Sequence, residues 1–176
     1  AHADRLGDTI AEIATVKAGI IKPGALAVSA AQDATAAAVI RDTAAAQGAT
    51  LAVEGTDFAV TADVLAVGGQ QFSMRGLAGT YDDLYLPLYG PHQAYNAALA
   101  IAAVESLIGA GTVPLAPDIL AEGLAEATSP GRLQLIGIAP TVLVDSAHNP
   151  HGAAALVTAL RTSFDIDEWG AVVGIL

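Results

Sequence analysis

The stretch TVLVDSAHNPHG, residues 141–152, constrains the fold of this chain more than any other. Its apolar, largely β-branched start predicts a strand, which leads into Asp145 and a tight polar turn. Asn149 and Pro150 then have the order typical of a helix N-cap and first helical residue, and an Ala-rich run follows. The stretch therefore predicts a strand–loop–helix unit with Asp145 at the carboxyl end of the strand, where open α/β sheets bind ligands. The plainer alternative is that Asp145 and Asn149 are loop and capping residues.

Helical and strand patterns alternate along the rest of the chain. Helices are expected at about 9–18, 33–47, 91–108, 116–127 and 150–162, and strands at 25–30, 50–53, 132–138, 141–145 and 170–176. The strand at 25–30 is expected to be buried, and residues 57–88 have a β-like pattern broken by Gly-Gly and Gly-Thr turns. This alternation argues for an α/β fold. The Ser, Pro and Gly of residues 128–132 are typical of a connector between domains.

The composition limits which partners the chain can bind. The sequence is 53% hydrophobic and has no long uninterrupted apolar run, so it has material for a large core but does not support a membrane span. A net charge of −11 disfavours nucleic acids and anionic membranes as partners. An anionic small molecule would have to be held by a few cations, by backbone N–H groups or by a metal ion. The absence of cysteine excludes disulfides and thiolate metal sites, and it fits a reducing compartment.

Lys17 lies inside the otherwise apolar stretch EIATVKAGIIKPG, residues 12–24. On a helix it shares one face with Ile10, Ile13 and Ala14, since these residues are spaced three and four apart. Ammonium groups are almost never fully buried without a partner, so a lysine on this face needs an explanation. Judged from these residues alone, the stem of Lys17 would lie along the core with its amine in water.

Polar residues gather at the start of the helix expected after Gly90 and Pro91. His92, Gln93 and Asn96 fall within its first two turns, on neighbouring faces. Amide side chains can recognise the edge of a nucleobase or position a phosphate. Ordinary helix capping explains the same residues equally well when they are considered alone.

The remaining candidates are one arginine and three histidines. Arg132 directly follows the connector, where its guanidinium could bind a phosphate with two parallel hydrogen bonds or simply lie at the surface. His148 and His151 are three residues apart, which is weak evidence for a metal site, and we expect His151 to be exposed or hydrogen-bonded. His2 could be a metal ligand, although it lies at the very start of the chain.

Taken in order, four patterns resemble the folylpolyglutamate synthase and dihydrofolate synthase family, within the Mur ligase superfamily. They are HxDxLG…EIAxxKAGI from residue 2, GxHQxxNxxxA from residue 90, SPGR at 129–132 and VDxAHNPHG from residue 144. The Mur ligases proper have related patterns. The His-Gln pair and the DxAHNP form are more similar to the folate branch.

The resemblance implies an α/β fold made of parts of two domains. Residues 1–128 would be the later part of a Mur-ligase-type ATP-binding domain, residues 129–132 a linker, and residues 133–176 the beginning of a Rossmann-like C-terminal domain that binds glutamate. The Gly-rich GK[ST] phosphate-binding loop of the family is absent from the sequence. We therefore expect an internal piece of a larger enzyme that is inactive by itself.

The activity implied is an ATP-dependent ligation. The family joins a carboxyl group of folate or dihydropteroate to glutamate through an acyl phosphate, with ATP and Mg²⁺. By resemblance, Asn96, Arg132 and Asp145 would contact ATP, with Gln93 as a further candidate. His148 would act beside the phosphates, His2 would bind Mg²⁺, and Lys17 would carry a carbamate formed from CO₂. Burial would favour the neutral amine that reacts with CO₂, which would explain why a lysine lies on an apolar face.

Two other functions remain open at this point. The chain could be a piece of a Mur-type cell-wall amino-acid ligase, which has a different substrate and the same chemistry, or a non-catalytic binding protein that lacks the phosphate loop. In the preferred interpretation the partners are small molecules, with no nucleic acid and no membrane, and the protein is a cytoplasmic monomer.

Overall fold

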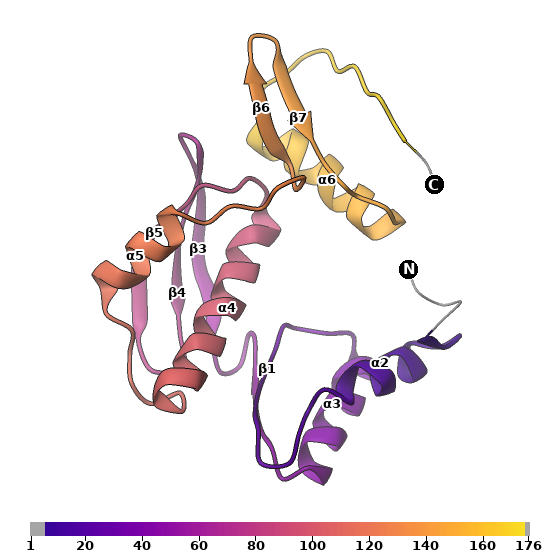
Figure 1. Ribbon diagram of the computed structural model, residues 1–176, viewed down its shortest axis with the longest axis vertical. Coiled ribbons are helices and arrows are strands. Elements are labelled where there is room, and N and C mark those ends of the chain that lie inside the picture. The colour runs from indigo at the N-terminus through magenta and orange to yellow at the C-terminus, as the bar shows by residue number, and fades with distance from the viewer. Residues whose placement is uncertain (1–5, 175–176) are drawn as a thin grey trace.

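The computed structural model describes residues 6–174 (Figure 1), and it confirms the mixed α/β fold. Its elements, in chain order, are α2 (Ile10–Ala18), β1 (Leu26–Ser29), α3 (Ala34–Ala46), β2 (Thr50–Val53), β3 (Ala59–Ala66), β4 (Gly69–Arg75), β5 (Thr80–Leu86), α4 (Pro91–Gly109), α5 (Pro117–Ala125), β6 (Gln134–Ile138), β7 (Thr141–Val144) and α6 (Pro150–Ser163). Among the residues described, no helix is both long and apolar enough to cross a membrane.

The first part of the fold packs α2 and α3 against a parallel strand pair. β1 and β2 pair in parallel with Leu26 opposite Thr50. A small core of Ala18, Ile21 and Ala44 lies between the helices and the strands. Helix α2 begins as its sequence predicts, because the Thr9 hydroxyl accepts the N–H of Glu12 while the Glu12 carboxylate accepts the N–H of Thr9.

β1 is less buried than its apolar sequence predicts. The prediction of a buried strand at 25–30 is wrong for this chain, since Leu26 is 43% exposed and the other residues of β1 are only partly buried. The physical reason is that β1 lies at the edge of its sheet: in residues 6–174 it pairs with β2 alone. One side of an otherwise core-type strand therefore stays open to solvent.

The second part is an antiparallel sheet covered by α4 and α5. The strands have the order β3-β4-β5, and Phe58, Phe72, Met74 and Leu86 are buried beneath the helices together with Ile101 of α4. Figure 1 shows the long helix α4 running beside this sheet, and α4 contacts β1 as well as β3. Helix α4 therefore connects the two parts.

A glutamate lies at the centre of this second part. Glu105 of α4 is fully buried, and its carboxylate accepts hydrogen bonds from the N–H groups of Leu77 and Ala78 and from the Tyr81 hydroxyl, at 2.7, 3.2 and 2.7 Å. The Tyr81 oxygen in turn accepts the N–H of Leu115 at 2.8 Å. Burial and the neighbouring carboxylate raise the pKa of Tyr81. The network fixes the β4–β5 turn against α4 and was not foreseen from the sequence.

The last part contains the strand–loop–helix unit. β6 and β7 form an antiparallel hairpin, and the loop after β7 leads into α6. The strand expected at 170–176 is absent from residues 170–174, and residues 175–176 lie outside the described range. A strand needs a neighbour to hydrogen-bond with, and here Val172 and Val173 are largely exposed.

Candidate functional site

A cavity of about 290 Å³ lies where the start of α4 meets the C-terminal hairpin and α6. Three of the residues predicted to bind a nucleotide, Asn96, Arg132 and Asp145, line it together. They come from α4, from the end of the connector and from the loop after β7. The other lining residues are His92, Leu133, Ala147, His151, Gly152, Ala155, Leu156 and Ala159.

Gly90 sets how closely α4 and α6 approach. It is the N-cap of α4, with φ of 101°, and a Cβ atom placed there would lie 3.0 Å from the Cβ of Ala159. Ala159 is itself fully buried. Glycine is needed here for two reasons, the left-handed backbone and the close contact with α6. Pro91 then begins the helix, as the sequence predicts.

Asn96 is oriented by its neighbour Gln93. Gln93 is 8% exposed, and its side-chain oxygen accepts a hydrogen bond from the Asn96 amide nitrogen at 3.2 Å. Gln93 was a further candidate for contact with a nucleotide, but it is not among the residues that line the cavity. Its observed contact is the one that holds Asn96 at the cavity wall.

Asp145 joins the end of the connector to the loop after β7. One carboxylate oxygen accepts the N–H of Leu133 at 2.8 Å, and the other accepts the N–H of Ala147 at 2.7 Å. Ser146 adds two bonds to the Gly131 carbonyl, one from its N–H and one from its hydroxyl, both at 2.8 Å. The loop capping expected of Asp145 is thus present, and the same contacts place its carboxylate at the cavity.

Arg132 is the cation of this cavity. Its side chain is exposed and donates no hydrogen bond to any part of the chain between residues 6 and 174. A guanidinium that is anchored at its backbone but free at its tip is suited to binding an anion with two parallel hydrogen bonds.

The charges of the cavity act on His92. Desolvation lowers the pKa of His92 below its ordinary value, Asp145 raises it, and Arg132 lowers it further. The cavity therefore places an imidazole within the electrostatic reach of both a carboxylate and a guanidinium.

His148 lies in the loop after β7 and His151 in the first turn of α6, and the exposure expected of His151 is confirmed. His151, expected to be exposed or hydrogen-bonded, is exposed and also lines the cavity. His148 is exposed and outside the cavity lining, and its Nδ1 lies 3.0 Å from the carbonyl oxygen of Ser146. The role predicted for His148 is not tested by this geometry. The signal that could have identified His151 is its position two residues after the Asn149 cap, where the first turn of α6 faces the loop.

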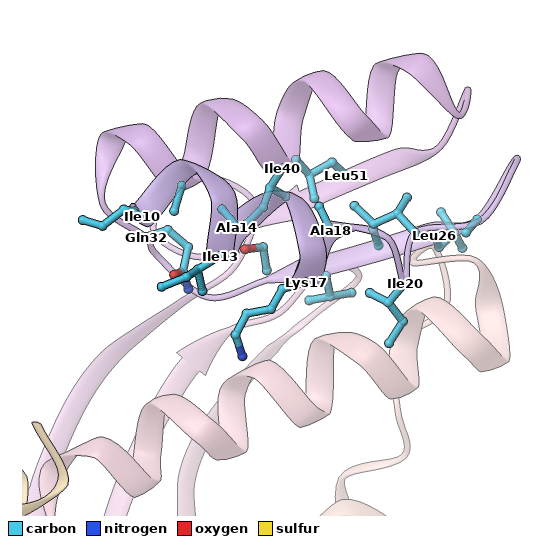
Figure 2. A pocket seen from close by; sticks show the side chains of 16 residues that line it. Ile10, Ile13, Ala14, Lys17, Ala18, Ile20, Leu26, Gln32, Ile40 and Leu51 are labelled. Atoms are coloured by element: carbon cyan, nitrogen blue, oxygen red, sulfur yellow. The ribbon is translucent and has the colours of Figure 1, made fainter. Parts of the chain in front are cut away.

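Lys17 belongs to a different cavity. About 550 Å³ of mainly apolar space lies between α2, β1 and α3, and Ile10, Ile13 and Ala14 line it together with Lys17, as helical spacing predicts. Figure 2 shows the Lys17 side chain extending away from Ile40 and Leu51. Lys17 is exposed, as expected from the residues of this chain alone, and the burial that the family resemblance implies is not seen here.

No metal site is formed by the residues that the structure describes. Between residues 6 and 174 there is no group of three or more His, Asp or Glu side chains that could hold an ion. His2, the predicted magnesium ligand, lies outside the described residues.

Comparison with known proteins places these features in a family. No family model matches the sequence. Dihydrofolate synthase/folylpolyglutamate synthase of Mycobacterium tuberculosis is 44% identical over 99% of this chain and 37% of its own length. The solved structure of M. tuberculosis folylpolyglutamate synthase with ADP and AMPPCP has a TM-score of 0.86 over 92% of this chain and 37% of that chain. A folylpolyglutamate synthase complex with AMPPCP and folate has a TM-score of 0.84 at 38% identity, over 92% of this chain and 39% of that one.

The class of protein is therefore that of the Mur-ligase-type synthases, and these two related structures were solved with adenine nucleotides bound. The chain belongs to the folylpolyglutamate synthase and dihydrofolate synthase family. It spans a little over a third of the length of these relatives. A cell-wall diaminopimelate ligase of Corynebacterium glutamicum is 32% identical over a shorter part, 71% of this chain and 23% of its own length.

Proposed function

We propose that this chain is part of an ATP-dependent ligase that joins a carboxyl group of folate or dihydropteroate to glutamate through an acyl phosphate. The observation that carries the proposal is the meeting of Asn96, Arg132 and Asp145 at one cavity. Relatives over nearly the whole chain are named for this activity, and one related structure contains both AMPPCP and folate. The greater identity and coverage of the folate synthase favour it over the cell-wall ligase.

The residues at this cavity suit an adenine nucleotide. Arg132 would bind a phosphate group, since its guanidinium is free and cationic. Asn96 offers an amide, held by Gln93, and Asp145 offers the unused lone pairs of a carboxylate to hydroxyl or amino donors. When bound, ATP would supply the phosphoryl group that activates the acceptor's carboxyl group.

The roles proposed for Lys17, His148, His2 and Mg²⁺ rest on the family resemblance. Lys17 would carry a carbamate in the longer protein, where further chain would cover the open edge of β1. His148 would act beside the phosphates. Mg²⁺ would be bound through residues that include His2, and the residues between 6 and 174 contain no group that could hold the ion alone.

By itself, the chain is proposed to be inactive. The sequence contains no GK[ST] loop to hold the β- and γ-phosphates. We infer that the longer protein is a cytoplasmic monomer with small-molecule substrates. The alternatives to a folate ligase are a cell-wall amino-acid ligase and a non-catalytic binding protein.

One experiment separates these functions. A longer protein, carrying these residues together with the remaining segments of its relatives, is incubated with ATP, Mg²⁺ and radiolabelled glutamate. Dihydropteroate, a folate or a muramoyl peptide is then supplied in parallel reactions. Label transfer to a pterin substrate supports the folate ligase, and transfer to the muramoyl peptide alone contradicts it. Nucleotide binding without any transfer would identify a binding protein.

A further inference from the structure

The start of α4 presents a histidine to the charged groups of the cavity. His92 is the second residue of α4, and it lines the cavity together with Arg132 and Asp145. None of the nucleotide contacts proposed above involves it. Its ring is close enough to both charges for them to shift its pKa in opposite directions.

The position of the His92 ring is set by the close approach of α4 and α6. A Cβ atom at Gly90 would lie 2.7 Å from Cε1 of His92, 3.0 Å from its Nδ1 and 3.0 Å from Cβ of Ala159. The imidazole therefore lies against bare backbone at the point where the two helices meet. Any side chain at position 90 would displace it, so the glycine provides the space that the ring occupies.

Four titratable or charged groups from neighbouring elements lie in the two cavities at the start of α4. Arg132 at the end of the connector, Asp145 in the loop after β7 and His151 on α6 line the same cavity as His92. Asp63 of β3 lines a second cavity together with Gly90 and Pro91, and burial raises the pKa of its carboxyl group. At neutral pH the charges of Arg132 and Asp145 offset each other, so the cavity has no surplus positive charge for a polyphosphate.

We propose that His92 is an additional nucleotide-binding residue, which takes up a proton when the polyphosphate of a nucleotide enters the cavity. The inference rests on the proposed nucleotide site. A phosphate bound at Arg132 neutralises the guanidinium and adds negative charge beside the ring, and both changes stabilise the imidazolium. Because binding then consumes a proton, the nucleotide affinity contributed by His92 rises as the pH falls toward the ordinary pKa of histidine.

The test uses the 176-residue chain and follows the ring Cε1–H signal of His92 by NMR, from about pH 5 to about pH 8. Titrations are run without ligand, with ADP and with adenosine. We expect ADP to raise the midpoint of His92 by about half a pH unit or more, and adenosine to leave it unchanged, because adenosine has no phosphate. An equal change with adenosine would overturn the inference.

A pair of variants gives a second readout. His92→Gln keeps a polar side chain but cannot be protonated, and His151→Gln removes the other histidine that lines the cavity. The ratio of wild-type to His92→Gln affinity for ADP should rise about threefold between pH 8 and pH 5. This ratio cancels the titration of ADP itself. The corresponding ratio for His151→Gln should change less.

The outcomes separate the two proposals. If ADP shifts the signals of Asn96 and Arg132 while the His92 midpoint stays fixed, the inference fails and the nucleotide site stands. If ADP shifts no signal at the cavity, the site assignment fails and the inference fails with it. If His92→Gln does not fold, the wild-type titration alone decides.

Discussion

The carboxylate of Asp145 accepts the backbone N–H of Leu133 at 2.8 Å, and this bond links the end of the connector to the end of β7. Leu133 is buried and has a positive φ of 46°, which is unusual for a residue other than glycine. The bond therefore holds a strained stretch of backbone directly beside Arg132. The same carboxylate that would bind the nucleotide also fixes the backbone from which Arg132 extends.

Replacing Asp145 should consequently affect both structure and binding. Asp145→Ala leaves the N–H groups of Leu133 and Ala147 without their acceptor, and we expect a loss of about 2–3 kcal/mol in the free energy of unfolding. Asp145→Asn keeps one acceptor oxygen and should lose about 1 kcal/mol. Urea unfolding measures both variants. Equal stability of Asp145→Ala and wild type would show that these bonds do not hold the loop.

Glu105 should be essential to the stability of the α4–sheet core. Glu105→Ala leaves the donors of Leu77, Ala78 and Tyr81 unpaired in a buried site, so we expect a loss of about 3–5 kcal/mol in the free energy of unfolding. Glu122→Ala, on the exposed side of α5, is the matched control and should change stability by less than about 0.5 kcal/mol. A small effect at both positions would contradict the role of the network.

Because of the capping box of α2, the free energy of unfolding of the chain should depend on pH in the acid range. Hydrogen bonds from the N–H groups of Asp8 and Thr9 lower the pKa of Glu12 in the folded state. Its stabilising effect is therefore present above the ordinary pKa of the free side chain and is lost as the pH falls through the lowered value.

Glu12→Gln tests this dependence. The variant should be less stable than wild type at pH 7, and the difference should shrink as the pH falls below 4.5, the ordinary pKa of a glutamate side chain. Urea unfolding at a series of pH values measures the difference, with Glu122→Gln as the control. A difference that stays constant across the series would exclude Glu12 as its source.

Lys17 should carry a carbamate only in the longer protein. In the present chain its amine is exposed, so labelled bicarbonate should give no carbamate carbon signal by NMR. In the longer protein the signal should appear in wild type and disappear in Lys17→Ala. It should persist in the control Lys22→Ala, which removes a lysine that donates to the Gly19 carbonyl at 3.0 Å.

Lys17→Ala should also lose most ligase activity, without rescue by bicarbonate. Full activity of that variant would refute the modification's role.

Local chemistry made much of the fold predictable. Thr9 and Glu12 identified the start of α2, Pro91 the start of α4, and Asn149 the start of α6, because each effect lies within a few residues of the chain. The meeting of Asn96, Arg132 and Asp145 was also anticipated, through the resemblance rather than through spacing.

Features that depend on distant contacts could not be predicted in this way. Glu105 accepts from Leu77, 28 residues away, and nothing in either local sequence indicates the pairing. The exposure of Leu26 follows from the missing neighbour of β1, and His151 reaches the cavity because of how α6 packs on α4. The burial of a side chain, and the meeting of distant side chains at one cavity, depend on tertiary packing, which an apolar pattern alone does not specify.

The affinity of the chain for ADP, compared between two arginine variants, tests the central claim most directly. Arg132 lines the cavity, whereas Arg161 lies in the last turn of α6 and outside the cavity lining. Replacing either arginine with alanine removes one positive charge, so the two variants differ only in where the charge is lost. If the nucleotide binds at this cavity, Arg132→Ala should weaken ADP binding by about 2–4 kcal/mol in an NMR titration, and Arg161→Ala should leave it nearly unchanged. Equal affinities for the two variants would show that the nucleotide does not bind at Arg132.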